Sequence, residues 1–219
     1  MMVQFSGFDA QDFDVFAIPD FHDRMFHIRS RIRPKLAQLG DDVAPKLSTL
    51  GHPMYPHTAS HARRRVNPPD DTWVAFSRSA RGYKRYAHFE IGINHEEVFV
   101  RFVVKPEGTD DKPGLLQLLK VNGIEAFQAL QDPEPIYWYR DDHGRDPMRI
   151  ADLTPEAVSH ILKETDKKSR GFTLGMVLNR ANAVVRSAQL VAASANMITH
   201  LGPIYRATVA EDAAVGAHG

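Results

Sequence analysis

Two neighbouring segments, YAHFEIGI and VFVRFVVK, constrain the fold of this chain more than any other feature. Apolar and polar residues alternate in both, which is the period of a β-strand with one buried face. The four residues NHEE join the segments as a hairpin loop. If Ile93 faces Val98, the same register places Glu90 opposite Arg101 on the other face, where the two side chains predict an ion pair.

Three further segments have the composition of strands: TWVAFS before the hairpin, and IYWYR and GFTLGMVL after it. Helical patterns precede, separate and follow these segments. The sequence therefore predicts an α+β fold with a mainly antiparallel sheet of about five strands, flanked by N-terminal and C-terminal helices.

The N-terminal region contains clear helix signals. Asp9 and Asp20 stand where N-caps are expected, and Phe8 and Phe13 have the spacing of a hydrophobic staple. Pro34 should kink or break the second helix, because it has no N–H to donate and its ring clashes with the preceding turn. The core-facing stripe of that helix consists of Phe21, Met25, Ile28, Ile32, Leu36 and Leu39.

Later helices are predicted over residues 41–50, 115–130, 154–167 and 179–200. Gly51 is the expected stop of the first, and Asn122-Gly123 is an expected break in the second. Thr154 followed by Pro155 is an N-cap with proline at the first helical position.

Length and composition indicate one globular domain. With 219 residues, 43% of them hydrophobic, the chain can form a single core, which we expect over residues 1–206. The last segment, 207–219, is small and polar enough to be disordered. The N-terminus lacks the pattern of a secretory signal, and no apolar run is long enough for a membrane span, so a cytoplasmic protein without membrane contact is expected. Cysteine is absent, which excludes disulfides and thiolate chemistry.

Several longer stretches resemble a known family. These are RMFHIRSRIRPKL, then HPMYPHTASHARRRVNPPDDTWVAFSRSARGYKRYAHFEIGI, and the late FTLG and LGPIYR. Together they resemble the YktB-like family of bacterial proteins, described as domain of unknown function 1054, over most of the chain. The resemblance implies a single α+β bacterial domain and supplies no activity or catalytic residue.

A cluster of basic residues lies between His61 and His88. Seven cations stand against two aspartates, an excess of five charges within 28 residues of a chain with zero formal net charge. Arginine binds phosphate or carboxylate through two parallel hydrogen bonds, and aromatic residues interleaved with the cations could stack on a ligand. The predicted anion contacts are Arg63, Arg64, Arg65, Arg81, Lys84 and Arg85, with Trp73 and Tyr83 as flanking aromatics.

A structural role for the same cluster is the competing hypothesis. The segment NPPDD is a rigid bend whose aspartates could pair with the neighbouring arginines, leaving a solvated basic surface. Nucleic acid is disfavoured as a partner, because the net charge is zero and no helix-turn-helix, RNP or GxxG motif is present.

The histidines give weak support for a metal site. His57 and His61 could share a helix face at a spacing that suits zinc, with His88, Glu90 or His95 as a third ligand. The glutamate of an HExxH motif is missing, and local hydrogen bonding explains both histidines as well. The turn DDHGRD lacks the spacing of a calcium loop. No cofactor is therefore predicted.

The sequence supports three hypotheses about function. The first is a binding or regulatory module with a basic surface for a phosphate- or carboxylate-bearing ligand. The second is an enzyme acting on a phosphorylated substrate, in which a histidine is the acid–base group or metal ligand. The third is a protein-interaction factor without a small ligand. Because no GxSxG, SxxK, GxxxxGK[ST] or GxGxxG motif is present, the sequence does not decide whether the chain is an enzyme.

Overall fold

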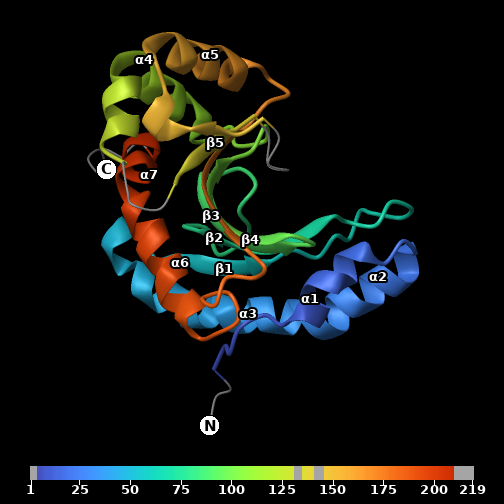
Figure 1. Ribbon diagram of the computed structural model, residues 1–219. Coiled ribbons are helices and arrows are strands. Elements are labelled where there is room, and N and C mark those ends of the chain that lie inside the picture. The colour runs from blue at the N-terminus through green and yellow to red at the C-terminus, as the bar shows by residue number, and fades with distance from the viewer. Residues whose placement is uncertain (1–3, 131–134, 141–145, 210–219) are drawn as a thin grey trace, which may run out of the picture.

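A computed structural model describes residues 4–130, 135–140 and 146–209. Its centre is a curved antiparallel sheet with the strand order β1-β2-β3-β4-β7-β5-β6 (Figure 1). The α+β prediction is confirmed. The strands are β1 Tyr55–Thr58, β2 Asp71–Ser77, β3 His88–Asn94, β4 Glu97–Val104, β5 Tyr137–Tyr139, β6 Met148–Arg149 and β7 Phe172–Asn179.

The expected number of about five strands is too low, because the described part of the sheet has seven. The five expected segments form β2, β3, β4, β5 and β7. The two additional strands, β1 and β6, are the edges of the sheet and contain four and two residues. Short edge strands carry little periodic pattern, and Pro56 in β1 is tolerated because an edge strand has unpaired N–H positions.

The predicted hairpin register is confirmed at every position tested: Ile93 pairs with Val98, and Glu90 faces Arg101. The expected ion pair between those last two residues is wrong. The Glu90 carboxylate instead contacts His88 and Lys105, and Arg101 Nη2 lies 3.7 Å from Glu97 Oε1. The register determines which backbone positions are adjacent. A long side chain can instead reach a partner several residues away along its own strand or the neighbouring one.

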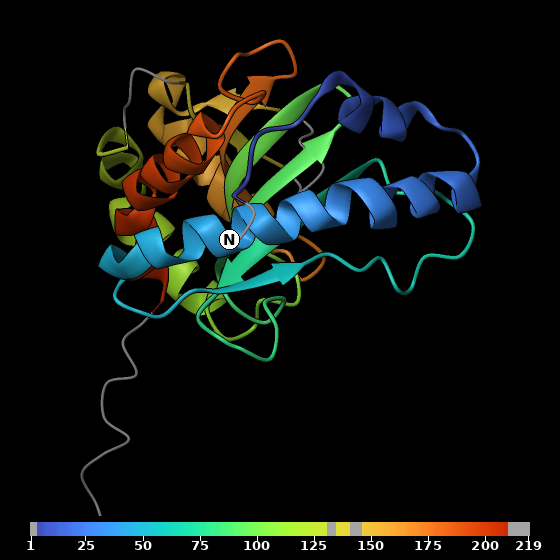
Figure 2. The same cartoon turned by 90° about the horizontal axis from the view of Figure 1, so that it is seen from below.

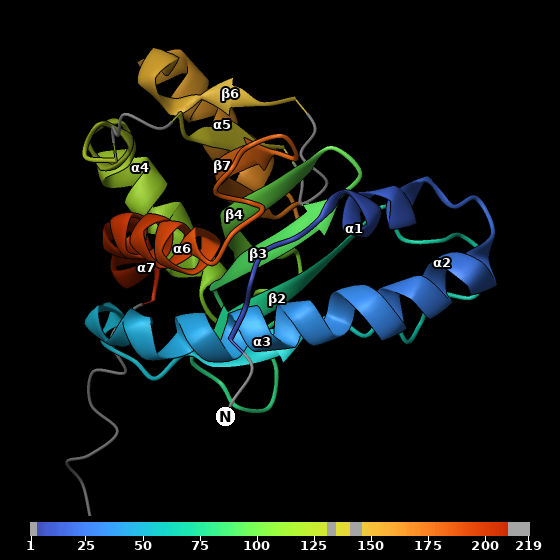
Figure 3. The same ribbon diagram turned by 60° about the horizontal axis from the view of Figure 1, so that its bottom comes forward.

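The N-terminal helices begin where their caps predict. The side chain of Asp9 accepts hydrogen bonds from the first turn of α1 (Ala10–Asp14), and Asp12 completes a capping box. Asp20 caps α2 (Phe21–His27). The chain then passes through a π-helical turn, Ile28–Ile32, into α3 (Arg33–Val43), so that α2 and α3 form one long rod (Figures 2 and 3).

The helix forms a π turn immediately before Pro34 and continues through the proline as α3, so the predicted break does not occur. Proline clashes with the carbonyl four residues before it, and the wider π turn immediately upstream changes that spacing. The expected helix at 41–50 is partly confirmed: α3 ends at Val43, and Ala44–Leu50 forms a 3₁₀ segment. Gly51 follows with a φ of 88°, the left-handed conformation expected of a C-terminal stop.

The C-terminal helices are α4 (Lys112–Gln128), α5 (Pro155–Asp166), α6 (Gln189–His200) and α7 (Gly202–Thr208). Thr154 caps α5, and Asn122 breaks α4 with a φ of −134°, both as predicted. The predicted helix over 179–200 is too long at its start. The side chains of Asn179 and Asn182 accept N–H groups two residues ahead, which stabilises turns in place of helix.

Helices cover one face of the sheet. Helix α3 packs on β1 and β2, and α6 packs on β4, so that α3, α6 and α7 lie along the same side of the sheet (Figure 1). Phe89, Phe102, Phe172 and Tyr205 meet in an aromatic core between the two layers. The opposite face, called the open face below, bears most of the polar side chains of β3 and β4.

The C-terminal part of the chain packs against this core. Thr208 and Val209 are buried at the end of α7. The remainder of the tail that the sequence predicts to be disordered lies outside the described residues. None of the described helices is long and apolar enough to cross a membrane.

Candidate functional site

The open face of the sheet aligns residues from six strands in one row. One cross-strand row can be followed through the pairings of β1, β2, β3, β4, β7 and β5. Side chains that face each other across neighbouring strands lie within contact distance. The row consists of His57, Ala75, Glu90, Arg101, Gly175 and Tyr137.

A pocket of about 640 Å³, called the basic pocket below, lies over the β1 end of this face. The loop between β2 and β3 supplies Arg81, Tyr83, Lys84 and Arg85, four of the eight residues predicted from the sequence. None of the residues that line the pocket is acidic. The others are His57, Thr58, Ala59, Ser60, Ser79, Gly82 and Tyr86.

Gly82 allows this loop to turn. Its φ of +152° is a conformation that glycine adopts readily and other residues rarely do. The loop is anchored at both ends by Asp111, which accepts two hydrogen bonds from Arg78 at 2.6 and 2.9 Å and one from the backbone N–H of Ala87. The hydrogen bonds of Asp111 therefore hold in place the two ends of the loop that carries the cations.

The cations of the basic pocket differ in their pairing. Arg85 Nη2 lies 3.0 Å from the carboxylate of Asp110, an ion pair at the surface. Arg81 and Lys84 are exposed, and neither has an ion pair within the described residues. The positive charge of the pocket is therefore only partly neutralised.

Tyr83 connects the basic pocket to the buried part of the open face. Its ring centroid lies 6.0 Å from that of His57 and 4.9 Å from that of His88. His57 Nε2 lies 2.9 Å from the carbonyl oxygen of Ser79, to which it donates because a carbonyl can only accept. The neutral ring then carries its lone pair on Nδ1.

A buried charged network, made of His88, Glu90 and Lys105, lies behind Tyr83. His88 Nε2 is 3.1 Å and Lys105 Nζ is 3.2 Å from Glu90 Oε1, and none of the three residues is more than 6% exposed. Burial raises the pKa of Glu90, but the charges of Lys105 and His88 outweigh it and lower that pKa to about 2. Glu90 is consequently ionised at neutral pH.

Both ring nitrogens of His88 face hydrogen-bond acceptors. Its Nδ1 lies 2.7 Å from the carbonyl oxygen of Tyr86, which can only accept. Its Nε2 lies 3.1 Å from Glu90 Oε1. The ring is therefore held between the backbone just before β3 and the buried carboxylate.

The remaining residues of the predicted anion cluster do not line the basic pocket. Arg63 and Arg65 are exposed on the loop of residues 59–70. Arg64 lines a different pocket of about 590 Å³, together with the acidic residues Asp70, Asp71, Glu96 and Glu97. The structure thus divides the predicted cluster into two groups.

Trp73 lies on the open face beside the buried network. Lys105 Nζ is 5.0 Å from its ring centroid, a cation–π contact, and the His61 ring meets it edge-on at 5.5 Å. Burial lowers the pKa of His61 to about 4; Asp71 opposes this change, whereas Arg64, Arg33 and Lys84 add to it. Both aromatic residues therefore pack within the protein and do not line the basic pocket.

Asp70 of the NPPDD bend pairs with an arginine far away in the sequence, and not with one of the neighbouring arginines as the structural hypothesis supposed. Arg24 of α2 binds Asp70 at 3.3 Å, and its Nη1 donates to the carbonyl oxygen of Pro69 at 3.0 Å. Its Nε donates to Ile18. Arg24, only 7% exposed, therefore fastens the loop of residues 59–70 to the N-terminal helices.

The candidate metal ligands lie on different elements. His57 lies on β1 and His61 on the following loop, so the expected shared helix face is wrong. His61 Nε2 contacts Thr72 Oγ1 at 3.1 Å, and both nitrogens of His88 are occupied. No group of three or more potential metal ligands is present in the described part of the chain. Residues 141–145 of DDHGRD lie outside the described residues, and its last residue, Asp146, pairs with Arg140.

Sequence reasoning missed the wall of the basic pocket that faces the cationic loop. The sequence suggests His57 as a metal ligand or acid–base group without placing it beside these cations, and it does not identify Ser60 or Ser79. The signal that would place them is the pairing of β1 with β2, and β1 has too short and irregular a pattern to reveal it.

Comparison with known proteins identifies the family. The model of the domain of unknown function DUF1054 matches residues 8–205. A UPF0637 protein of Bacillus velezensis is 50% identical over 181 residues, covering 81% of this chain and 84% of the relative. One of Staphylococcus carnosus is 50% identical over 166 residues (75% and 79%), and one of Oceanobacillus iheyensis is 30% identical over 207 residues (93% and 97%). With its fold, its hairpin and its N-terminal helices inside the matched region, this chain belongs to the DUF1054 family.

Proposed function

We propose that this protein is a cytoplasmic binding or regulatory module whose basic pocket holds a small organic ligand bearing phosphate or carboxylate groups. The observation that carries the proposal is the meeting of Arg81, Lys84 and Arg85 in one concave site without an acidic lining residue. A volume of about 640 Å³ falls in the range of ~300–1,000 Å³ typical of small-molecule sites.

The charges favour a ligand over a solvated surface. Exposed ion pairs contribute only ~0–1 kcal/mol, so the contact between Arg85 and Asp110 leaves Arg85 available to a ligand. Arg81 and Lys84 are held near it by the same loop. An anion in the pocket would relieve the repulsion among the three cations.

The walls of the basic pocket suit the organic part of such a ligand. Tyr83 and Tyr86 supply aromatic surface, and Ser60 and Ser79 supply hydroxyl groups. Aromatic walls with few polar groups are typical of sites that orient a metabolite. The concave shape and the zero net charge favour a small molecule over nucleic acid.

Direct binding tests this proposal. The probes are pyrophosphate and citrate, which are simple multiply charged phosphate and carboxylate anions, titrated by calorimetry at constant ionic strength. We expect Lys84→Glu and the double variant Arg81→Ala/Lys84→Ala to weaken binding at least about tenfold, since each contact of this kind contributes ~1.5–3 kcal/mol.

Matched controls separate the pocket from general charge. Lys163→Glu on α5 and Arg63→Ala on the loop of residues 59–70 change exposed cations outside the pocket. Both should bind like the unmodified protein, and all variants should keep its melting temperature. Equal losses in the control and pocket variants would refute a specific site. A large loss of stability in Lys84→Glu would mean that the cluster is structural.

An enzyme acting on a phosphorylated substrate is the second candidate, and the placement of His57 favours it. Because Nε2–H donates to Ser79, the Nδ1 lone pair of the neutral ring is available as a general base beside the cations. Release of inorganic phosphate from p-nitrophenyl phosphate tests this. Activity that is lost in His57→Gln while pyrophosphate still binds would establish the enzyme, and absence of activity would leave the binding module.

A further inference from the structure

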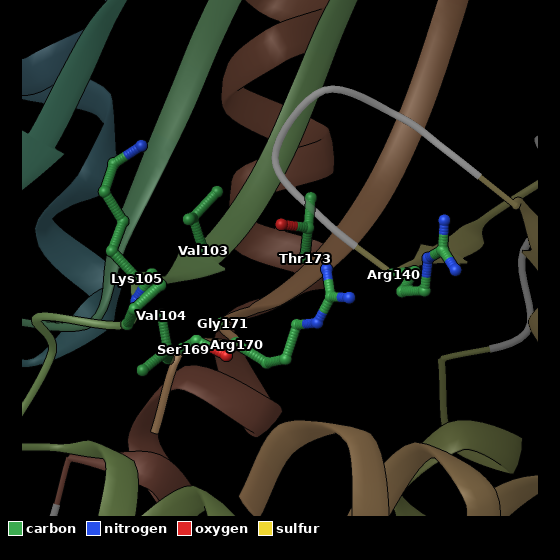
Figure 4. Close-up of a pocket in the computed structure, with 9 residues that line it drawn as sticks. Val103, Val104, Lys105, Arg140, Ser169, Arg170, Gly171 and Thr173 are labelled. Carbon is green, nitrogen blue, oxygen red and sulfur yellow. The ribbon is translucent and has the colours of Figure 1, made fainter. Parts of the chain in front are cut away.

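A second basic cavity lies on the same face of the sheet, beyond the buried network. It has a volume of about 80 Å³, far smaller than the basic pocket, and lies where β4 ends and β7 begins (Figure 4). We call it the arginine cavity. Its lining residues are Val103, Val104, Lys105, Pro106, Arg140, Ser169, Arg170, Gly171 and Thr173.

The arginine cavity carries positive charge without an acidic wall. Arg140 follows β5, and Arg170 precedes β7, so the two arginines come from separate parts of the chain. Figure 4 shows the Arg170 guanidinium extending from its loop into the space between Thr173 and Arg140. No carboxylate is among the lining residues that the structure describes.

Arg170 is held by its backbone, while its side chain has no partner in the part of the chain that the structure describes. Its N–H donates to the carbonyl oxygen of Lys167 at 3.0 Å, and its own carbonyl accepts from Lys112 Nζ at 2.8 Å. Lys112 also binds the carbonyl oxygen of Lys167, so the turn is fixed at both ends. Its guanidinium forms no hydrogen bond or ion pair with any residue in the described ranges. A fixed backbone reduces the entropy lost when such a side chain binds a ligand.

Arg140 is only partly satisfied. Its Nη2 lies 2.9 Å from Asp146, whose side chain is 64% exposed, while its buried Nε has no hydrogen-bond partner in the described structure. A buried donor without a partner carries a free-energy cost. A ligand in the arginine cavity could remove that cost.

The acidic side chains nearest to the arginine cavity have closer partners than Arg170. Asp146 and Glu164 line a neighbouring pocket with Arg140 and Arg170. A hydrogen bond from Lys167 lowers the pKa of Glu164, with a smaller effect from Arg170. Glu164 is therefore engaged mainly by Lys167, and Asp146 by Arg140, so Arg170 has no ion pair of its own among the described residues.

Lys105 adds to the positive potential without being a contact for a ligand. Its ammonium group lies 3.2 Å from Glu90 and points away from Arg140 and Arg170 in Figure 4. Gly171 explains why the cavity is narrow. A Cβ at this position would lie 2.5 Å from the carbonyl oxygen of Val104, so only glycine lets the segment before β7 approach the end of β4.

These contacts define the chemistry of the occupant. Two guanidinium forks together with the hydroxyl groups of Ser169 and Thr173 offer donors from several directions, which suits a compact group with acceptors on all sides. The small volume leaves no room for an organic body. We propose that the arginine cavity binds a single tetrahedral oxyanion, of the phosphate or sulfate type, through Arg140 and Arg170.

This site is separate from the basic pocket. Val103, which lines the arginine cavity, is the cross-strand partner of His88, whose ring contacts Tyr83 of the basic pocket. The buried network therefore lies between the two cavities. The proposal for the arginine cavity does not depend on the proposed function of the basic pocket.

Calorimetry with inorganic phosphate and sulfate, at an ionic strength held constant with chloride, tests the proposal. We expect both to bind the intact chain, and acetate to bind at least about tenfold more weakly, since a planar carboxylate satisfies fewer donors. Arg170→Gln and Arg140→Gln should each weaken phosphate binding about tenfold or more. Arg170→Lys should lie between Arg170→Gln and the intact protein, because it keeps the charge and loses the fork.

Two controls locate the binding. Arg149→Gln changes an exposed arginine on β6 outside the cavity and should leave phosphate affinity unchanged. Arg81→Ala/Lys84→Ala changes the basic pocket and should also retain the phosphate site. Melting temperatures without phosphate show that each variant folds; phosphate should raise the melting temperature of the intact protein more than that of Arg170→Gln.

Three results would overturn the proposal. The first is an absence of phosphate and sulfate binding to the intact chain at millimolar concentration. The second is an affinity that survives in both Arg170→Gln and Arg140→Gln. The third is a loss of phosphate binding in Arg81→Ala/Lys84→Ala alone, which would assign the anion to the basic pocket.

Discussion

Glu90 Oε1 lies 3.2 Å from Lys105 Nζ on the open face of the sheet, with 2% of Glu90 and 6% of Lys105 exposed. His88 approaches the same oxygen from within β3, at 3.1 Å. The Glu90 carboxylate compensates the desolvation of the Lys105 ammonium group, and the buried network lies between the two basic cavities of this face. We therefore expect the stability of the fold to depend on this one buried acid.

Replacing Glu90 with glutamine should be strongly destabilising. Removal of one member of a buried ion pair leaves charge without compensation, which typically costs ~3–5 kcal/mol of unfolding free energy. Urea denaturation measures this. Glu107→Gln, at an exposed acid nearby, should stay within ~0.5 kcal/mol of the unmodified protein. Adding Lys105→Met to Glu90→Gln should recover part of the loss, and an undiminished stability of the single variant would contradict the role given to the network.

The pKa of Glu90 predicts how stability changes in acid. Its value is lowered from 4.5 to about 2 on folding, so the unfolded chain takes up a proton first as the pH falls. The stability that Glu90 contributes is fully present above pH 4.5 and is lost as the pH falls towards about 2. Urea midpoints measured across that interval should fall more steeply for the unmodified protein than for Glu90→Gln. Parallel curves would show that Glu90 does not titrate in this way.

His61 predicts a second pH interval in which the stability of the fold changes. Its pKa is lowered from 6.5 to about 4 on folding because the ring is buried. As the pH falls from 6.5 to about 4, the unfolded chain takes up this proton first, so the stability of the fold should decrease. Below about pH 4 the histidine should cause no further change. His61→Asn should flatten the curve in that interval, and asparagine tolerates the left-handed φ of 49° at this position. His52→Asn, at an exposed histidine, should leave the slope as it is.

Removal of the Arg24 side chain should release the loop of residues 59–70. Arg24 donates to the carbonyl oxygens of Ile18 and Pro69 and pairs with Asp70. Arg24→Ala therefore removes the hydrogen bond and the ion pair that join α2 to the loop. Limited trypsin digestion should then cleave after Arg63, Arg64 or Arg65 several-fold faster, because proteolysis follows local opening. Arg29→Ala, on the exposed side of the same rod, is the control, and an equal rate in both variants would exclude the fastening role.

Local signals in the sequence determined much of the fold. The alternation in β3 and β4 fixes their register, since a slip of one residue would turn every core side chain to the open face. Asp9, Asp20 and Thr154 begin their helices because a capping side chain satisfies backbone groups within three residues. These relationships act over short distances along the chain, or across a tight hairpin.

The candidate site was determined only in part by sequence. Arg81, Tyr83, Lys84 and Arg85 were identified because they are neighbours in one loop. Arg64 was grouped with them by proximity along the chain, although it lines a different pocket. Charge density in a sequence window indicates a basic region and does not indicate the direction in which each side chain points.

Tertiary structure alone decided which distant groups meet. Glu90 faces Arg101 in register and yet binds Lys105. A buried carboxylate without a partner is unfavourable, and the long Lys105 side chain reaches the Glu90 carboxylate from the end of β4. Arg140 and Arg170 lie 30 positions apart and converge only when β5 pairs with β7. The sequence determines helix caps and hairpin register, because their geometry depends on residues that are close together in the chain. The partners of buried charges depend on the packing of the complete sheet.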